Sequence, residues 1–203
     1  QKNQLNTIKA LGKLNELKSK FEILEEGIKD VSIAIGHTRW ATHGKVMLEN
    51  THPILSENIA VVHNGIIENH DQIRLELTEK NVVFETTTDT EVISHLLSNS
   101  MKNNNNFFDA CVSVVKKIEG AYAFAAIQSL NEEIFVARKT SPLVLGIGDG
   151  YNIVGSDAQS ISQMVSEVIY LNDGDYAILN KTTIKIYDSN NRSVEREKIN
   201  IKS

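Results

Sequence analysis

The sequence of 203 residues has one cysteine, two prolines and no apolar run long enough to cross a membrane, which takes about 20 residues. A single cysteine excludes an internal disulfide and a cysteine-rich zinc site. Such sparse cysteine usage is typical of a reducing compartment, so we expect a cytoplasmic protein without a membrane segment. Basic residues are also in the minority, 21 Lys and Arg against 26 Asp and Glu, which is unfavourable for binding nucleic acid.

The overall composition of the chain is that of an ordinary globular protein. Hydrophobic residues make up 41% and charged residues 23% of the chain, which excludes disordered, collagen-like and coiled-coil proteins. A chain of this length buries roughly 70% of its unfolded surface and needs no covalent cross-links. No repeat or flexible linker divides it, so we expect a single domain over residues 1–203.

The first part of the chain predicts a helix followed by two strands. Apolar residues spaced three and four positions apart predict one face of a helix: Leu14, Leu17, Phe21, Leu24 and Ile28. The β-branched run at residues 31–35 predicts a buried strand, and a second apolar run predicts a strand at residues 59–62.

Further helices are predicted from capping and periodicity. Asn69 with Gln72, and the segment 88–91 (TDTE), resemble capping boxes at the starts of two helices. A third helix is predicted over residues 107–118 from its apolar stripe. Cys111 lies on this stripe, so we expect it to pack in the core rather than to react.

After Gly120, short apolar runs of strand length follow one another, with Asp-Gly turn signals between some of them. Strands are predicted at residues 121–127, 134–137, 143–147, 151–154, 168–171, 176–179 and 183–187, with a short helix near 158–165. Helices mixed with strands, followed by antiparallel strands, favour an α+β fold in which one sheet packs on another with helices outside.

A polar loop bounded by glycines, residues 36–44, follows the first predicted strand and contains the only tryptophan, Trp40. Arg39 offers a planar fork suited to a carboxylate, and Thr42 and His43 lie just beyond. These residues together fit a small zwitterionic ligand. An ordinary surface loop with a packed tryptophan explains them equally well.

Asn64 and Gly65 directly follow the second predicted strand. The asparagine amide and the glycine N–H are two donors that can converge on one oxygen, as in an oxyanion hole for acyl transfer, although an Asn-Gly turn is the simpler local explanation. Asp89 opens a predicted helix, where its carboxylate could cap the helix or receive an ammonium group.

Metal and cofactor sites are not expected. The histidines nearest these segments lack the spacing of zinc ligands: His37, His43 and His63. The glycine-rich run at residues 146–150 lies between predicted strands without a following helix, so a tight turn explains it better than a phosphate-binding loop.

Three segments in this order resemble the glutaminase domain of glutamine–fructose-6-phosphate aminotransferases, which are class II glutamine amidotransferases: GHTRWATHG at 36–44, VHNGIIENH at 62–70 and TDTEV at 88–92. Later segments resemble the same family: residues 120–124, 137–144 and 155–158. The resemblance runs from about Leu11 to the end. It implies the N-terminal-nucleophile hydrolase fold, two stacked antiparallel sheets flanked by helices.

The resemblance implies a glutamine-binding role for four residues. Arg39 matches the residue that holds the α-carboxylate of glutamine, and Thr42 and His43 match residues of the same binding loop. Asp89 matches the carboxylate that receives the α-amino group. L-glutamine is therefore the implied ligand, and no cofactor or metal is implied.

The resemblance also implies a reaction. Asn64 and Gly65 match the oxyanion hole, and Trp40 matches the residue that gates ammonia passage. A thiolate attacks the γ-amide of glutamine, forms a glutamyl thioester and releases ammonia. The ammonia then converts fructose 6-phosphate to glucosamine 6-phosphate in sugar isomerase domains of the same polypeptide, through which a homo-oligomer is expected.

The sequence departs from the family at its start. The family nucleophile is an N-terminal cysteine, whereas Gln1 stands first here and Cys111 lies far from that position. We therefore expect an N-terminally truncated glutaminase domain, inactive by itself, without the nucleophile, the first strand and helix, or the isomerase domains. Two alternatives stay open: another class II amidotransferase with a different ammonia acceptor, and a non-catalytic glutamine-binding module.

Overall fold

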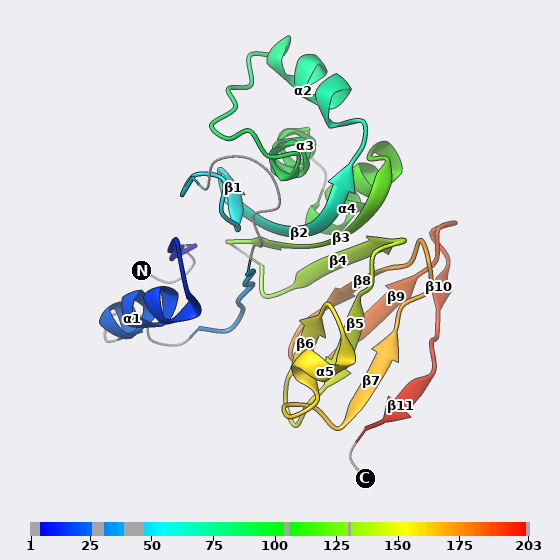
Figure 1. Ribbon diagram of the computed structural model, residues 1–203. Helices are drawn as coiled ribbons and strands as arrows, with labels where there is room; N and C mark the ends of the chain where they lie inside the picture. The colour runs from blue at the N-terminus through cyan, green and yellow to red at the C-terminus, as the bar shows by residue number, and fades with distance from the viewer. Residues whose placement is uncertain (1–4, 26–30, 39–46, 104–105, 130, 202–203) are drawn as a thin grey trace.

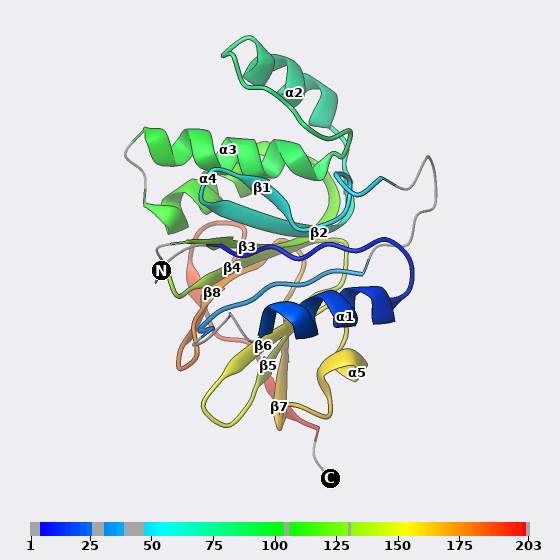
Figure 2. The ribbon, with the colours of Figure 1, turned by 90° about the vertical axis from the view of Figure 1, so that its left-hand side faces the viewer.

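The computed structural model describes residues 5–25, 31–38, 47–103, 106–129 and 131–201 (Figure 1). Two antiparallel sheets are stacked face to face, with helices on their outer sides (Figure 2). The layered α+β architecture predicted from the sequence is confirmed.

The larger sheet has seven strands in the order β1-β2-β3-β4-β8-β9-β10. These strands are β1 (Ile54–Ser56), β2 (Ile59–Ile67), β3 (Gly120–Gln128), β4 (Ile134–Lys139), β8 (Tyr176–Leu179), β9 (Ile184–Tyr187) and β10 (Ser193–Val194). β2 and β3 pair along their whole length, from Ile59 opposite Gln128 to Ile67 opposite Gly120. This long pair forms the centre of the molecule.

The smaller sheet has four strands in the order β11-β7-β5-β6. These are β5 (Val144–Ile147), β6 (Asn152–Gly155), β7 (Glu167–Tyr170) and β11 (Lys198–Asn200), with the short helix α5 (Ala158–Ile161) beside them. The helix predicted near 158–165 is shorter than expected. It ends at Ile161, and the N–H of Met164 donates to the carbonyl of Ile161, three residues back, which is the contact of a turn.

On the outer side of the larger sheet, α3 (Thr90–Lys102) and α4 (Phe107–Lys117) pack on its strands, and α2 (His70–Thr78) packs on α3 farther from the sheet (Figure 2). Because successive strand residues point to opposite faces, β3 contributes to two cores. Tyr122 and Phe124 pack in the core against the helices, whereas Ala123 and Ala125 pack in the core between the sheets.

Cys111 is completely buried in the core between α4 and the larger sheet. Burial raises the pKa of its thiol well above the usual value. The prediction that Cys111 is a packing residue is confirmed.

The N-terminal part differs from its prediction. The helix α1 (Leu14–Glu25) forms, but its described apolar side chains are not buried: Leu14 is 65% and Phe21 48% exposed, and Leu17 is partly exposed. Residues 31–38 are extended but not a strand, and Val31 is 61% exposed. The predicted buried strand is wrong because no described strand pairs with this segment, although Ile35 packs against the core between the sheets.

Helices begin at both predicted capping boxes, but neither box forms: the hydroxyl of Thr88, the expected cap of the second box, lies 2.9 Å from that of Thr86. Asn69 and Asp89 occupy the N-cap positions of α2 and α3, but neither side chain caps its helix. The Asn69 side chain instead donates to the carbonyl of Lys117 and accepts from the N–H of Glu119. Asp89 accepts from the N–H of Ile67, at the end of β2. Both side chains therefore bind backbone groups that are distant in the sequence, and not the N–H groups of their own helices.

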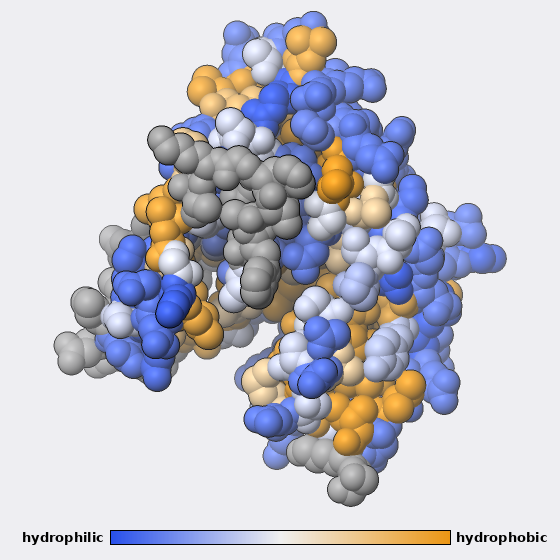
Figure 3. Space-filling view, in the orientation of Figure 1, coloured by the Kyte–Doolittle hydropathy of each residue, from blue (hydrophilic) through white to orange (hydrophobic). Residues whose placement is uncertain are grey.

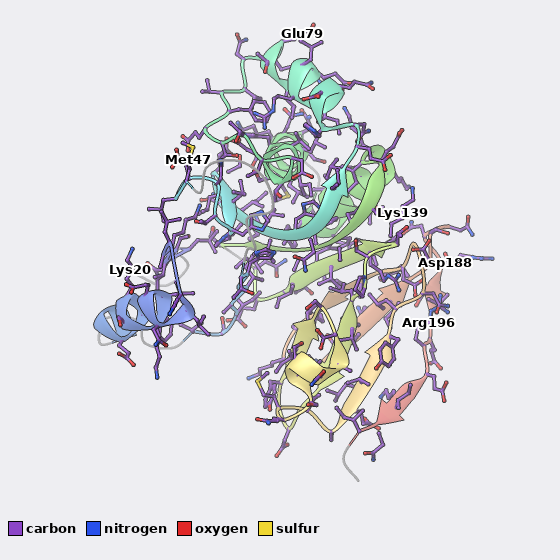
Figure 4. All side chains as sticks on the ribbon, viewed as in Figure 1. Lys20, Met47, Glu79, Lys139, Asp188 and Arg196 are labelled. Atoms are coloured by element: carbon purple, nitrogen blue, oxygen red, sulfur yellow. The ribbon has the colours of Figure 1, made fainter. Side chains whose placement is uncertain are left out.

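Arg196, labelled in Figure 4, lies between β10 and β11, where the chain passes from the larger to the smaller sheet. It donates two hydrogen bonds to Asp175, at 2.7 and 2.9 Å, and Asp175 is 1% exposed. Removing one partner of a buried pair leaves an uncompensated charge, so this ion pair secures the crossing.

Candidate functional site

An open groove of about 520 Å³ lies beside the space between the sheets. Its described lining comes from residues 34–38, from the middle of β2 and β3, and from β6. In Figure 3 a recess is visible on this face between α1 and the smaller sheet. The groove brings residues of the 36–44 motif next to residues of the 62–70 motif.

Asn64 joins these two motifs. It lies on β2 in an exposed stretch, and its side-chain oxygen Oδ1 is 2.6 Å from Nε2 of His37, which precedes it by 27 residues. Side chains alternate along β2, so Asn64 faces the groove while His63 faces α3. An amide group thus stands at the wall of an accessible groove.

Gly65 follows Asn64 with a φ of +107°, a conformation that glycine adopts without steric cost. The local alternative of an Asn-Gly hairpin turn is wrong, because β2 continues through both residues and Gly65 pairs with Tyr122 of β3. The strand bends here without ending. Asn64, Gly65 and Ile66 are all exposed, whereas the neighbouring β2 residues are buried.

Asp89 lies at the end of β2, not in the groove lining. Its Oδ2 accepts a hydrogen bond of 2.8 Å from the N–H of Ile67, and its Oδ1 is 3.9 Å from Nδ1 of His63. The side chain is 23% exposed. The backbone contact fixes the carboxylate, and the Oδ1 atom is beyond hydrogen-bond distance of that histidine.

Glu91 anchors the segment that leads to Asp89, a role that sequence reasoning missed. It accepts from the N–H groups of Glu85 and Thr86, at 2.7 and 2.8 Å, and from the Thr86 hydroxyl. Burial by itself raises the pKa of Glu91, but these hydrogen bonds and one from His95 outweigh it, and the pKa is lower than usual. The Glu91 side chain does not cap a helix but holds the loop at residues 85–86. The sequence did not reveal this role, because a glutamate three residues after Thr88 has the spacing of a capping box.

A buried chain of polar groups lies behind β2, on the side of α3. The Thr90 hydroxyl is 3.0 Å from Nδ1 of His63 and 3.1 Å from Nε2 of His52. Burial lowers the pKa of His63 to about 4, although the negative charge of Asp89 opposes this shift. His63 is therefore neutral at neutral pH.

Four of the predicted site residues, Arg39, Trp40, Thr42 and His43, lie outside the described residues. Their assignment to a glutamine-binding and ammonia-gating loop stays a prediction. Within the described ranges, no three His, Cys, Asp or Glu side chains are grouped so as to hold a metal ion. No helix in the same ranges is both long and apolar enough to span a membrane.

The fold is that of the N-terminal-nucleophile hydrolases of the class II amidotransferase type. It has two stacked antiparallel sheets with outer helices, and Gly65 of β2 lies beside an open groove. The chain belongs to the glutamine amidotransferase family, since the family described as "Glutamine amidotransferase domain" matches residues 37–163.

Solved structures support this fold. The glutamine phosphoribosylpyrophosphate amidotransferase from B. subtilis, complexed with ADP and GMP, superposes with a TM-score of 0.64 at 26% identity, covering 75% of this chain and 34% of that one. A glutamine aminotransferase class-II domain protein from Silicibacter pomeroyi superposes with a TM-score of 0.54 at 14% identity, over 70% of this chain and 72% of that one. The second likeness concerns the fold alone.

Curated relatives are more similar in sequence. The glutamine–fructose-6-phosphate aminotransferase [isomerizing] of Idiomarina loihiensis is 46% identical over 197 residues, 96% of this chain and 32% of the relative. The protein of the same name from Xanthomonas campestris is 43% identical over 166 residues, 81% of this chain and 27% of the relative. The chain therefore spans about a third of the length of these relatives.

Proposed function

We propose that this domain hydrolyses glutamine and supplies the ammonia that converts fructose 6-phosphate to glucosamine 6-phosphate. The observation that carries the proposal is the exposed Asn64–Gly65 pair on β2, presented beside an open groove. Relatives 46% and 43% identical to this chain carry the name of that aminotransferase, which supports the same acceptor.

In the proposed reaction a thiolate attacks the γ-amide carbon of glutamine, and the carbonyl oxygen gains the negative charge. The Nδ2 amide of Asn64 and the N–H of Gly65 donate to this oxyanion, each donor contributing about 2.7–4 kcal/mol in comparable acyl-transfer sites. The tetrahedral intermediate expels ammonia as the amide nitrogen takes up a proton, leaving a glutamyl thioester. Water then hydrolyses the thioester to glutamate and regenerates the thiol.

The thiol in this scheme is the N-terminal cysteine of the family. Cys111 does not fit the role, because it is fully buried and burial raises its pKa well above the usual value, which disfavours the reactive thiolate. The base in the family is the α-amine of the same N-terminal cysteine. In the proposed scheme this one cysteine therefore supplies both the nucleophile and the base.

Recognition of the amino-acid part of glutamine is assigned to charged residues of opposite sign. Asp89 receives the α-ammonium group through the carboxylate oxygen that the Ile67 N–H does not occupy. Arg39 binds the α-carboxylate in a bidentate manner, with Thr42 and His43 completing the loop, and Trp40 gates the passage of ammonia.

The proposed setting is a longer cytoplasmic polypeptide that carries sugar isomerase domains and forms a homo-oligomer through them. The chain spans 32% of the Idiomarina loihiensis relative, which leaves room for such domains. An amidotransferase with another acceptor and a non-catalytic glutamine-binding module are less well supported, because the similar curated relatives share one name.

The test is an Asn64→Ala substitution in the complete natural polypeptide. We expect kcat for glutamine hydrolysis to fall by about 10²–10³, with a small change in KM, because the donor acts on the transition state. Synthesis of glucosamine 6-phosphate from free ammonia should persist. Asn131→Ala, which removes only a contact with Glu133, is the matched control. Unchanged hydrolysis in Asn64→Ala, or no hydrolysis by the wild-type polypeptide, would refute the proposal.

A further inference from the structure

The side-chain amide of Asn64 can take two orientations of nearly equal shape. Only the NH₂ group can donate to an oxyanion, whereas the amide oxygen would present lone pairs to it. Asn64 is exposed, so core packing does not choose between the two orientations. A separate contact must make this choice if the residue is to act on the transition state.

We propose that His37 is a positioning residue that fixes the Asn64 amide with its NH₂ group available to the oxyanion. This inference rests on the proposed function. Its basis is the distance of 2.6 Å between Nε2 of His37 and Oδ1 of Asn64. An amide oxygen only accepts hydrogen bonds, so Nε2 of His37 carries the hydrogen and holds the oxygen. Both hydrogens of the Asn64 Nδ2 group then remain for a ligand.

The opposite tautomer of His37 is disfavoured at Nε2. Among the described residues, Nδ1 of His37 is buried and has no hydrogen-bond partner, so it is unsatisfied in either tautomer and does not distinguish them. A hydrogen on Nδ1 would place the lone pair of Nε2 against the lone pairs of Asn64 Oδ1 at 2.6 Å. The tautomer that positions the amide is thus the one that the surroundings accept.

The ring of His37 is itself supported from behind. It packs on the ring of His52, with 4.4 Å between the ring centroids and an interplanar angle of 58°. Nδ1 of His52 accepts from the backbone N–H of His63 at 3.4 Å, so the hydrogen of His52 is on Nε2. Nε2 of His52 then donates to the Thr90 hydroxyl at 3.1 Å, and this hydroxyl is also 3.0 Å from Nδ1 of His63.

The contacts of His52 with the backbone of His63 and with Thr90 hold its ring between β2 and the start of α3. His52 in turn limits the position of His37, whose own segment, residues 31–38, has no paired strand to hold it. The orientation of one exposed amide is therefore determined by a buried network on the other side of β2.

The test uses three variants of the complete polypeptide. His37→Leu removes the donor, and we expect kcat for glutamine hydrolysis to fall on the order of tenfold to a hundredfold, less than when the Asn64 donor is removed. KM for glutamine should stay within about twofold, as for an effect confined to the transition state. His37→Gln places an amide N–H near the position of Nε2 and should restore most of kcat. His70→Leu, outside this network, should behave as wild type.

A double-mutant cycle identifies the route of the effect. In an Asn64→Ala background, His37→Leu should cause little further loss, because His37 acts through Asn64. Fully additive losses, or a failure of His37→Gln to restore kcat, would overturn the inference.

A measurement independent of activity separates this inference from the proposed function. The ¹⁵N imidazole shifts of His37 should show the hydrogen on Nε2 in the wild type. A hydrogen on Nδ1 would overturn the positioning role even in an active enzyme. Conversely, an inactive wild type with the expected tautomer would refute the proposed function and leave the amide contact established.

Discussion

The carbonyl oxygen of Ala121 lies 2.0 Å from the position that a Cβ atom on Gly65 would occupy. Real Cβ atoms do not approach an oxygen so closely, and the φ of Gly65 is also positive, at +107°. Two independent constraints therefore require glycine at the bend of β2, one from the neighbouring strand and one from its own backbone.

Gly65→Ala should prevent correct pairing of β2 with β3, whereas Gly150→Ala should be tolerated. Gly150 also has a positive φ, +77°, but no atom lies within 4 Å of its hypothetical Cβ. Positive φ alone costs about 1–2 kcal/mol, and steric overlap adds about 1–3 kcal/mol at Gly65. Hydrogen exchange of the β2 amides should be faster in Gly65→Ala only. Equal protection in the two variants would mean that β2 shifts to make room.

Asp89→Asn should separate the charge of this residue from its structural contact. An asparagine oxygen can still accept from the Ile67 N–H, so we expect normal folding but a KM for glutamine raised by at least about tenfold, because the ammonium group loses its ion pair. Asp89→Ala should add a stability loss of about 1–3 kcal/mol, since the Ile67 N–H loses its acceptor. If Asp89→Asn left KM unchanged, the carboxylate would be structural only.

Local stability around β2 and α3 should fall in mild acid because of His63. Its pKa is about 4 in the folded protein against 6.5 for an ordinary histidine, so the unfolded form binds a proton first as the pH falls. The stabilisation is complete above about pH 6.5 and declines toward pH 4, by up to about 3 kcal/mol.

Hydrogen exchange of β2 and α3 amides, corrected for the pH dependence of the chemical step, measures this decline. Asp89, His37 and His52 are ionisable neighbours of His63, so the comparison needs a His63→Gln variant. Between pH 6.5 and pH 4, the stability measured by hydrogen exchange should depend less on pH in that variant. An equal decline in both proteins would assign it to the neighbouring groups.

Cys111 should react with thiol reagents only when the helical layer opens. Its side chain is fully buried and burial raises the pKa of the thiol, so both access and thiolate formation are suppressed. Peptide mapping after treatment with iodoacetamide should find this residue unmodified until denaturant is added. Cys111→Ser should retain glutaminase activity. Loss of activity in a folded Cys111→Ser protein would assign the thiol a part in catalysis.

Sequence patterns predicted the strands whose burial is regular. β3, β4, β5 and β8 carry apolar runs that pack on both sides, and runs of this kind are visible in sequence. The short strand β11 has no buried residue and owes its strand conformation to pairing with β7. Its own residues give no such signal, and the same holds for β10, which has two residues.

The candidate site residues could be named from the sequence, but the contacts that hold them could not. Asn64, Gly65 and Asp89 could be singled out because their functional groups suit an amide substrate. The contact between His37 and Asn64 joins residues 27 positions apart, and that between Asp89 and Ile67 joins residues 22 apart. Contacts over such separations depend on how the strands pack, which local propensity does not encode.

Side chains alternate along β2, so stability and turnover could be changed separately by substitutions on its two faces. Odd-numbered positions such as Val61 and His63 face the buried helical layer, and even-numbered positions such as Val62 and Asn64 face the groove or the space between the sheets. A library restricted to odd positions other than His63, which belongs to the buried network behind Asn64, would select for heat tolerance, and one restricted to even positions for turnover. Gly65 also belongs in neither library.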